Sequence, residues 1–307
     1  MIMCCGEALI DMLPRTTTAG EDAFAPYAGG AVFNTALALG RLGLDTSFFT
    51  GLSSDMFGDI LREALTASGV DHSPCATLDL NTTLAFVRLV NGQASYAFFD
   101  ENTAGRMITE AHLPDLGDDV EALHFGAISL IPDPCGATYE SLMRREHGAR
   151  VISLDPNIRP GFITDTAKHR ARIDRMIAMS DIVKMSDEDL EWFGQPDMET
   201  AARAWLAEGP SLVVFTRGPD GAIGFTSNHT VEVDGVPVTV ADTVGAGDTF
   251  NAGILASLKR DNLLTKQAMK SLSVEAIANA LSLGAKAASV TVSRPGANPP
   301  WASEIGF

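Results

Sequence analysis

Several features are scarce in this sequence. No stretch approaches about 18 consecutive apolar residues, so we expect no transmembrane helix. The start, MIMCCGEALIDML, lacks the basic segment and the long apolar run of a secretory signal peptide. The four cysteines form no Cys-x-x-Cys pair and no Cys/His cluster, which excludes the usual zinc sites. These absences favour a cytoplasmic protein with free thiols.

Basic residues are also few. The chain has 22 Lys and Arg against 39 Asp and Glu, and its formal net charge is −17. Nucleic acids and anionic membranes are bound mostly through Lys and Arg, and single-stranded bases stack on aromatic rings, yet only 3 Trp and 3 Tyr are present. We therefore expect no nucleic-acid or membrane partner. Binding of a small anionic ligand remains compatible with this net charge, because the local electrostatic field of a pocket determines it.

Strand and helix patterns alternate along most of the 307 residues. Short apolar runs predict strands at 2–6, 46–52, 122–129, 150–157, 181–186 and 211–218. Amphipathic patterns predict helices at 29–43, 55–70, 133–148, 166–180, about 245–260 and 273–289. This order predicts an α/β fold whose mostly parallel central sheet carries helices on both faces. The length is compatible with a single domain over 1–307.

Two segments break the alternation. Residues 81–100 carry two strand patterns around Asn91-Gly92, a strong type I′ hairpin signal. Residues 14–28 are rich in Pro and Thr, which predicts irregular chain. We interpret both as a small β lid on the main sheet, through which a homodimer would form. Asp234-Gly235 is a second candidate hairpin turn.

The stretch ADTVGAGDTFNAGIL, residues 241–255, carries the strongest chemical signal. The first N–H groups of a helix lack internal partners, and Gly245, Ala246 and Gly247 leave room for an anion to reach them. A carboxylate beside a bound phosphate is unfavourable unless Asp248 takes the proton of a hydroxyl that attacks phosphorus. Taken alone, however, Gly-x-Gly-Asp is more often a plain helix cap. The pattern is not a Walker-type loop, because GxxxxGK[ST] is absent.

A family resemblance adds to this reading. DTVGAGDTFNAGIL resembles the C-terminal signature of the PfkB (ribokinase-like) sugar kinases, and GGAVFNTALALGRLG followed by GLSSDMFG resembles the N-terminal one. The similarity spans essentially the whole chain, and CCGEALIDM, DENTAGRM, DPNIRPGF, VKMSDEDL and TVSRPGANPPW resemble bacterial fructokinases in particular. The resemblance implies a ribokinase-like fold with a small β lid. It also implies ATP and Mg²⁺ as cofactors and transfer of the γ-phosphate to the primary hydroxyl of a small sugar, with D-fructose favoured.

The resemblance also implies the residues of the sugar and phosphate sites. Asp248 matches the catalytic base, and Gly245, Ala246 and Gly247 match the anion hole. The matches to the sugar ligands are Asp11, Gly29, Gly30 and Asn34. Outside the family context, Asp11 would be a strand-end turn residue and Asn34 a helix cap.

On the nucleotide side, FTRGPDG (215–221) matches the nucleotide-phosphate loop of the family. The cofactor-binding candidates are Lys184, Ser186, Thr216, Gly218, Gly221 and, beside adenine, Ala285. Ser186 and Asp189 stand where the family usually has Asn and Glu, so a water-mediated Mg²⁺ role for Asp189 competes equally with a helix cap. Asp242 matches a position that binds a monovalent cation such as K⁺ in several relatives; its alternative is a turn carboxylate.

Three further side chains are candidates for sugar contact. Arg159 follows a strand end and could reach the sugar or the phosphates; a surface ion pair is equally compatible. Tyr96 and Phe98 share one face of the lid hairpin by their period-two spacing, so they would roof the sugar or pack the lid. Two other activities stay open. One is a 2-keto-3-deoxygluconate kinase or ribokinase, where Arg88, Arg106 or Arg159 would meet an acid substrate; the other is a non-catalytic sugar or nucleotide sensor.

Overall fold

The computed structural model describes the backbone of residues 1–90 and 93–307 and the side chains of residues 1–86 and 97–307. The predicted Asn91-Gly92 turn and the Tyr96 side chain lie outside the described residues. Within the described part, a nine-stranded sheet runs through the molecule in the order β15-β14-β13-β12-β11-β10-β1-β4-β6. The seven strands from β13 to β6 pair in parallel, and β14 pairs antiparallel with both β13 and β15, so the sheet is mostly parallel as predicted.

The strands of this sheet are short, as is usual for a buried parallel sheet. They are β1 (Ile2–Cys5), β4 (Thr46–Phe49), β6 (Val70–Asp71), β10 (Ala122–Gly126), β11 (Val151–Asp155), β12 (Ile182–Ser186), β13 (Leu212–Thr216), β14 (Ala222–Phe225) and β15 (Thr230–Val233). Beside the sheet, β5 (Gly51–Ser53) pairs with β7 (Ala76–Leu78).

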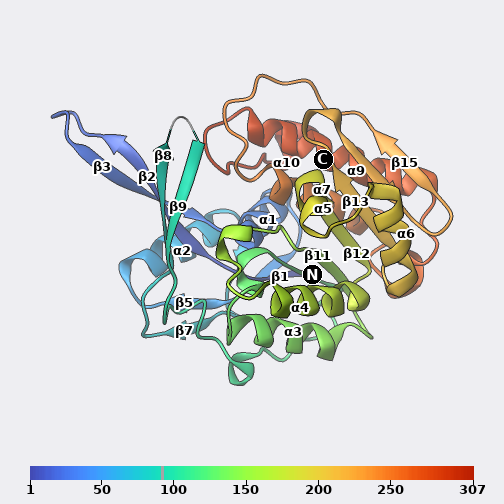
Figure 1. The fold of residues 1–307 in the computed structure, drawn as a ribbon, viewed down its shortest axis with the longest axis horizontal. Coiled ribbons are helices and arrows are strands. Elements are labelled where there is room, and N and C mark those ends of the chain that lie inside the picture. The colour runs from blue at the N-terminus through green and yellow to red at the C-terminus, as the bar shows by residue number, and fades with distance from the viewer. Residues whose placement is uncertain (91–92) are drawn as a thin grey trace.

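Helices cover both faces of the sheet and enclose two hydrophobic cores (Figure 1). One face carries α1 (Ala31–Arg41), α2 (Met56–Ala67), α7 (Ala246–Arg260), α8 (Lys266–Met269) and α9 (Val274–Val292). The other carries α3 (Cys135–Glu146), α4 (Thr166–Met179), α5 (Asp187–Trp192) and α6 (Met198–Glu208); the short α10 (Ala302–Ile305) ends the chain. The neighbours Cys4 and Cys5 enter opposite cores, as the alternation of a strand requires, and all four cysteines are free. No helix of the described chain has the length and apolarity to cross a bilayer.

A separate four-stranded sheet projects from one end of the molecule (Figure 1) and is called the lid here. Its strands are β3 (Asp22–Gly29), β2 (Leu9–Thr16), β8 (Leu84–Val90) and β9 (Gln93–Phe99), in that order. The prediction that 14–28 is irregular is therefore wrong. Proline is tolerated here because Pro26 is on an edge strand, and Pro14 lies beyond the part of β2 that pairs with β8, residues 10–12.

The predicted hairpin at Asp234-Gly235 is also wrong. The hairpin joins β14 to β15 instead, through a turn in which the Thr226 N–H donates to the His229 carbonyl (2.8 Å). The Thr226 hydroxyl oxygen also accepts the N–H groups of Asn228 and His229, so a threonine side chain closes a turn that contains no glycine. Asp234-Gly235 comes directly after β15.

The strand order reverses at β1, which lies between β4 and β10. In open α/β sheets, ligands bind beyond the carboxyl ends of the strands at such a reversal. The topology therefore directs attention to the loops that follow β1 and β10 to β13.

Candidate active site

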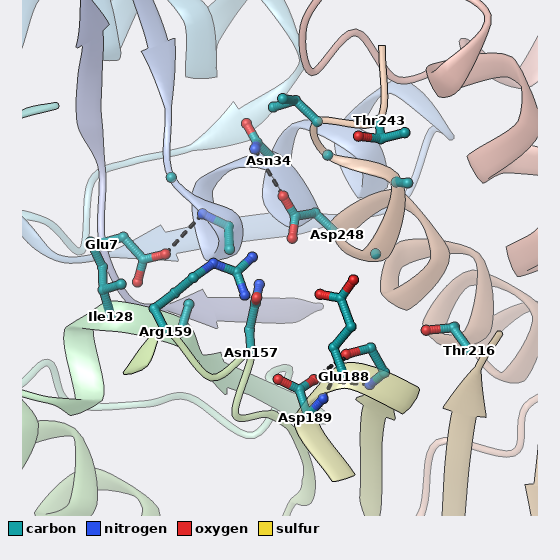
Figure 2. Close-up of a pocket in the computed structure, with 18 of the residues that line it drawn as sticks. Glu7, Asn34, Ile128, Asn157, Arg159, Glu188, Asp189, Thr216, Thr243 and Asp248 are labelled. Atoms are coloured by element: carbon teal, nitrogen blue, oxygen red, sulfur yellow. Dashed lines mark hydrogen bonds between the residues drawn. The ribbon is translucent and has the colours of Figure 1, made fainter. Parts of the chain in front are cut away.

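A cavity of about 490 Å³ lies at this edge of the sheet. Its lining residues follow successive strands: Glu7 after β1, 127–128 after β10, Asn157 and Arg159 after β11, 186–189 at the end of β12, and Thr216 and Gly218 at the end of β13. Residues 243–248 at the start of α7, Asn34 of α1, and Leu9, Asp11 and Phe98 of the lid complete the wall. In Figure 2, the side chains of Asn34, Arg159 and Glu188 converge on Asp248 from different elements.

Asp248 lies in the first turn of α7, is 7% exposed, and lines the cavity. The Asn34 amide Nδ2 donates to Asp248 Oδ2 at 2.9 Å (Figure 2). The Thr35 hydroxyl donates to the Asp248 backbone carbonyl at 3.1 Å. The first turn of α1 thus holds both the side chain and the backbone of Asp248. Asn34 Oδ1 is buried and has no hydrogen-bond partner among the described residues.

Burial raises the pKa of Asp248 to about 7. The Asn34 hydrogen bond lowers it, the Asp155 carboxylate raises it, the Lys184 ammonium lowers it and the Glu7 carboxylate raises it further. A carboxyl group with a pKa near 7 is well matched to accept a proton at neutral pH.

The N-terminus of α7 is open toward the cavity. Gly245 is the N-cap, in the left-handed conformation at φ +77°, and no side chain caps the helix. The N–H groups of Gly247 and Asp248 find no acceptor in the described part of the chain. Unpaired donors at the positive end of a 15-residue helix are features that favour anion binding, which is the role that the sequence predicts for 245–247.

A buried ion pair lies directly behind this helix start. Lys184, 4% exposed, places Nζ 3.1 Å from Asp155 Oδ2, and the Asn251 amide donates to the same oxygen at 2.7 Å. A methyl group on Gly247 would approach Lys184 Nζ to 2.9 Å. Burial lowers the pKa of Lys184, but the Asp155, Asp189 and Asp248 carboxylates outweigh that effect and raise it. Lys184 therefore stays charged beside the start of α7.

The lid contributes Asp11 and Phe98, which lie on one face of its sheet by the register Asp11–Ala85–Phe98. Burial raises the pKa of Asp11 to about 6. A Cβ on Gly29 would come 2.3 Å from Asp11 Oδ2, so Gly29 makes room for this carboxylate and does not itself line the cavity. The Phe98 ring meets Phe162 of the main body at 4.3 Å between centroids, edge to face, and joins the lid to the body.

On the opposite side, Asp189 uses both oxygens within the chain. Oδ1 accepts the Ile158 N–H at 2.7 Å, and Oδ2 accepts the N–H and hydroxyl of Ser186 at 2.9 and 2.8 Å. This capping box favours the helix-cap interpretation of Ser186 and Asp189. Glu188 is exposed and points into the cavity (Figure 2).

Arg159 lines the cavity, and among the described residues its guanidinium donates one hydrogen bond, to the carbonyl of Ile158 (2.9 Å). No carboxylate in the described chain forms an ion pair with Arg159, so the surface ion pair considered for it is not formed. Its guanidinium is a free cation within a largely acidic lining.

Besides Gly29, three predicted site residues do not line the cavity. Gly221 closes the turn after β13, where a Cβ would collide with the Val233 carbonyl at 2.1 Å. The Asp242 carboxylate accepts the N–H groups of Val244 (3.1 Å) and Gly296 (2.9 Å), as a turn carboxylate does. Ala285 lies on α9 and is buried in the hydrophobic core.

The structure also adds residues that the sequence reasoning missed, chiefly Glu7, Asn157 and Glu188. Glu7 and Asn157 come directly after β1 and β11. Their position after a strand in a parallel sheet was the available signal. The described residues contain no cluster of three or more His, Cys, Asp or Glu side chains that could hold a metal by themselves.

Comparisons with known proteins agree with this geometry. The family model for the pfkB family carbohydrate kinases matches residues 1–304 of this chain. The fructokinase of Rhizobium leguminosarum bv. trifolii is 68% identical over 280 residues, which cover 91% of this chain and 86% of that protein. The crystal structure of Xylella fastidiosa fructokinase with bound ATP matches with a TM-score of 0.91 at 28% identity, over 99% of this chain and 96% of that chain.

A further solved structure is the fructokinase of Vibrio cholerae O395 in its fructose-, ADP- and calcium-bound form. It matches with a TM-score of 0.84 at 25% identity, over 96% of this chain and 94% of that chain. The predicted ribokinase-like α/β fold and the resemblance to bacterial fructokinases are confirmed. The chain belongs to the pfkB family of carbohydrate kinases.

Proposed function

We propose that this kinase transfers the γ-phosphate of ATP to the primary hydroxyl of D-fructose and forms fructose 6-phosphate and ADP. One observation carries the mechanism: a buried carboxylate, Asp248, lies at the uncapped N-terminus of α7 inside a cavity that the lid borders. The 68% identity to a fructokinase supports the choice of sugar.

In the reaction, the sugar hydroxyl oxygen bonds to the γ-phosphorus and gives its proton to a carboxylate oxygen of Asp248. The bond from the γ-phosphorus to the bridging oxygen breaks, and ADP leaves. The N–H groups of Gly247 and Asp248 stabilise charge on the transferring phosphoryl group, and the Lys184 ammonium behind them adds positive potential. Asn34 orients the accepting carboxylate by its 2.9 Å hydrogen bond.

The sugar lies between the lid and α1. Asp11 accepts hydrogen bonds from sugar hydroxyls, and the backbone at Gly30 approaches the ring closely. Because Asn34 gives its amide N–H to Asp248, its unpartnered Oδ1 is the atom left for a sugar hydroxyl. Phe98 roofs the sugar and, with Phe162, excludes water from the reacting groups.

ATP enters over Thr216 and Gly218, with its terminal phosphate toward α7. Mg²⁺ fits this site, since it usually keeps several waters and needs only one or two carboxylates besides the phosphates. With Asp189 committed to the Ser186 cap, Asp187 and Glu188 would hold it. When bound, Mg²⁺ neutralises charge on the phosphates. Arg159 supplies a free cation for the transferred group.

The decisive experiment for the substrate is ADP release by the purified enzyme with D-fructose, D-ribose and 2-keto-3-deoxygluconate. We expect kcat/KM for fructose to exceed the other two by at least about tenfold, and ³¹P–¹³C coupling to place the phosphate on C6. A preference for the keto-acid would reassign Arg159 to the substrate carboxylate. Sugar binding without ADP release would contradict the kinase assignment.

The enzyme is further proposed to act in the cytoplasm as a homodimer that forms through its lid. The lid face opposite Asp11 carries an aromatic row, in which Phe86 contacts Phe24 (5.1 Å) and Phe99 (5.5 Å) edge to face. Phe24 and Phe99 are 49% and 60% exposed, which is unusual for large apolar rings unless a second copy covers them. Light scattering tests this proposal: Phe99→Glu converts a dimer to a monomer, and a monomeric unmodified protein contradicts it.

A further inference from the structure

Glu7 is a buried carboxylate for which the reaction described above has no use. It follows β1, is 8% exposed and lines the cavity. The described chain gives it no Lys or Arg ion-pair partner. Burial raises the pKa of Glu7 above its ordinary value, and its hydrogen bonds offset part of that rise. A buried charge without a cationic partner is destabilising, so its retention needs an explanation.

Its hydrogen bonds supply one. Glu7 Oε1 accepts the N–H groups of Ala31 (2.8 Å) and Val32 (3.4 Å), and Oε2 accepts the N–H of Ser129 (3.3 Å). Ala31 and Val32 are the first two residues of α1, whose N-cap is Gly30 and has no side chain to cap it. Glu7 is therefore the cap of α1, supplied from 24 residues earlier in the chain.

Gly30 fits this arrangement. Its φ of +115° suits glycine, and a Cβ there would approach the Glu7 carbonyl oxygen to 2.8 Å. The chain before α1 and the chain after β1 are thus in direct contact. The start of α1 is held by the side chain of Glu7, and Gly30 allows the two segments to approach closely.

One turn further along, α1 holds Asp248. Asn34 N–H bonds to the Gly30 carbonyl (2.8 Å), and its side chain donates to Asp248. The Thr35 hydroxyl bonds to the Ala31 carbonyl and to the Asp248 carbonyl, both at 3.1 Å. A continuous set of hydrogen bonds therefore leads from Glu7 through the first turn of α1 to Asp248.

We propose that Glu7 is a positioning residue for phosphoryl transfer, which places the Asp248 carboxylate by fixing the first turn of α1. The inference rests on the base role proposed for Asp248. It assigns Glu7 no contact with the sugar and no part in proton transfer.

The charge of Glu7 gives this role a second readout. Burial of Asp248 is the main cause of its raised pKa; Asn34 and Lys184 lower that pKa, and Asp155 and Glu7 raise it. The other ionisable side chains that line the same cavity are Asp11, Arg159, Asp187, Glu188 and Asp189. Neutralising Glu7 lowers the pKa of Asp248, and the acid limb of the pH–rate profile then moves to lower pH.

Two substitutions separate contact from charge. Glu7→Gln keeps an acceptor for Ala31 but removes the charge and turns an N–H₂ group toward the Ser129 N–H. We expect its acid limb at lower pH and a plateau kcat reduced by about threefold or more. Glu7→Asp keeps the charge but is too short to reach α1. We expect kcat to fall roughly tenfold with KM for ATP unchanged and the acid limb where the unmodified enzyme has it.

Glu140→Gln is the matched control. Glu140 is equally buried, at 6% exposed, but it binds Arg172 and Arg175 on the far side of the sheet. It should lower Tm and leave kcat and the pH profile unchanged. If Glu7→Gln does not fold, kcat and the pH profile of Glu7→Asp decide the question.

Glu7 variants that lower only Tm, as Glu140→Gln does, would overturn the proposal. So would plateau rates within about twofold of the unmodified enzyme in both Glu7 variants. An active Asp248→Asn enzyme would instead refute the base role itself, whatever the Glu7 variants do. An inactive Asp248→Asn enzyme with silent Glu7 variants would refute this inference alone.

Discussion

Of the helices that begin at the cavity, α1 and α7 share one kind of N-cap but differ in what satisfies it. Both α1 and α7 have a glycine N-cap with positive φ, Gly30 and Gly245, and neither glycine can cap its helix. At α1, the carboxylate of Glu7 accepts the first two N–H groups. At α7, no described side chain does so, and the Lys184 ammonium lies beside the helix start at Gly247.

The difference separates a structural helix start from a ligand site. Within its own helix, each start leaves its first N–H groups without a partner, and each lies at the positive end of a helix dipole. An acid over α1 cancels its positive potential and leaves that helix to orient Asn34 and Thr35. A cation behind α7 reinforces the potential, which suits a phosphate. The sequence around a glycine N-cap therefore does not by itself identify an anion site; the charge that faces it does.

The largest expected effect comes from closing the open helix start. Gly247→Val places a branched side chain against Lys184 Nζ, which a Cβ alone would approach to 2.9 Å. We expect kcat/KM for ATP to fall by roughly 10², the scale for loss of an anion-hole donor. Gly148→Val is the control, because Gly148 faces open space and lies far from the cavity. Equal activity of the two variants would contradict the claim that the start of α7, unlike that of α1, is a ligand site.

The pH dependence of the unmodified enzyme tests the role of Asp248, which lies in the first turn of α7. Because the base works deprotonated and its pKa is raised to about 7, kcat/KM should fall about tenfold for each pH unit below that value. Steady-state rates from pH 5.5 to 9 measure it. A flat profile down to pH 5.5 would mean that Asp248 has an ordinary acidity or does not act as the base.

Lys184→Gln sharpens the comparison by removing the cation behind α7. Since Lys184 lowers the pKa of Asp248, its loss should move the acid limb to higher pH, opposite to Glu7→Gln. At pH 7 we expect a loss of about tenfold. The control is Lys266→Gln, which breaks a partly buried pair with Asp181 away from the cavity. A shift of both Lys184→Gln and Glu7→Gln in one direction would contradict this electrostatic account.

The smallest effect concerns stability. The folded-state pKa of Asp248 lies above its ordinary value, so ionisation of Asp248 destabilises the folded protein. This destabilisation is absent below the ordinary pKa of 3.8, grows as pH rises, and is complete above about pH 7. Asp248→Asn should therefore raise Tm at pH 8 by about 2 °C or more, with a smaller gain at pH 5. An equal or lower Tm at pH 8 would show that burial of this charge is fully compensated.

The sequence was sufficient to predict the fold. It also predicted a helix that begins at about residue 245, and the structure places residues 245–248 in the wall of the cavity. Strand–helix alternation predicted the parallel sheet. The individual strands could be recognised because each strand that is buried on both faces is a continuous apolar run. The residues from Gly245 to Asp248 are adjacent in the chain, so one local pattern contained both the helix start and the acid. Asp11 and Asn34 depended on the family resemblance.

What the sequence did not reveal depends on contacts between distant segments. Glu7 caps a helix that begins 24 residues later, and no local pattern records such a pairing. The strands at 14–28 form because their prolines fall where β2 and β3 lack a second partner, which requires the sheet order. Ala285 lies in a 19-residue helix and packs into the hydrophobic core, a placement that depends on how α9 packs against the rest of the chain.

The rate of phosphoryl transfer by Asp248→Asn tests the central claim most directly. Turnover with saturating ATP and fructose is compared with fructose affinity by calorimetry, and Asp261→Asn at the far end of α7 is the control. We predict a fall in kcat of at least about 10² with sugar affinity nearly intact. Turnover within a few-fold of the unmodified enzyme would contradict the assignment of Asp248 as the group that takes the hydroxyl proton.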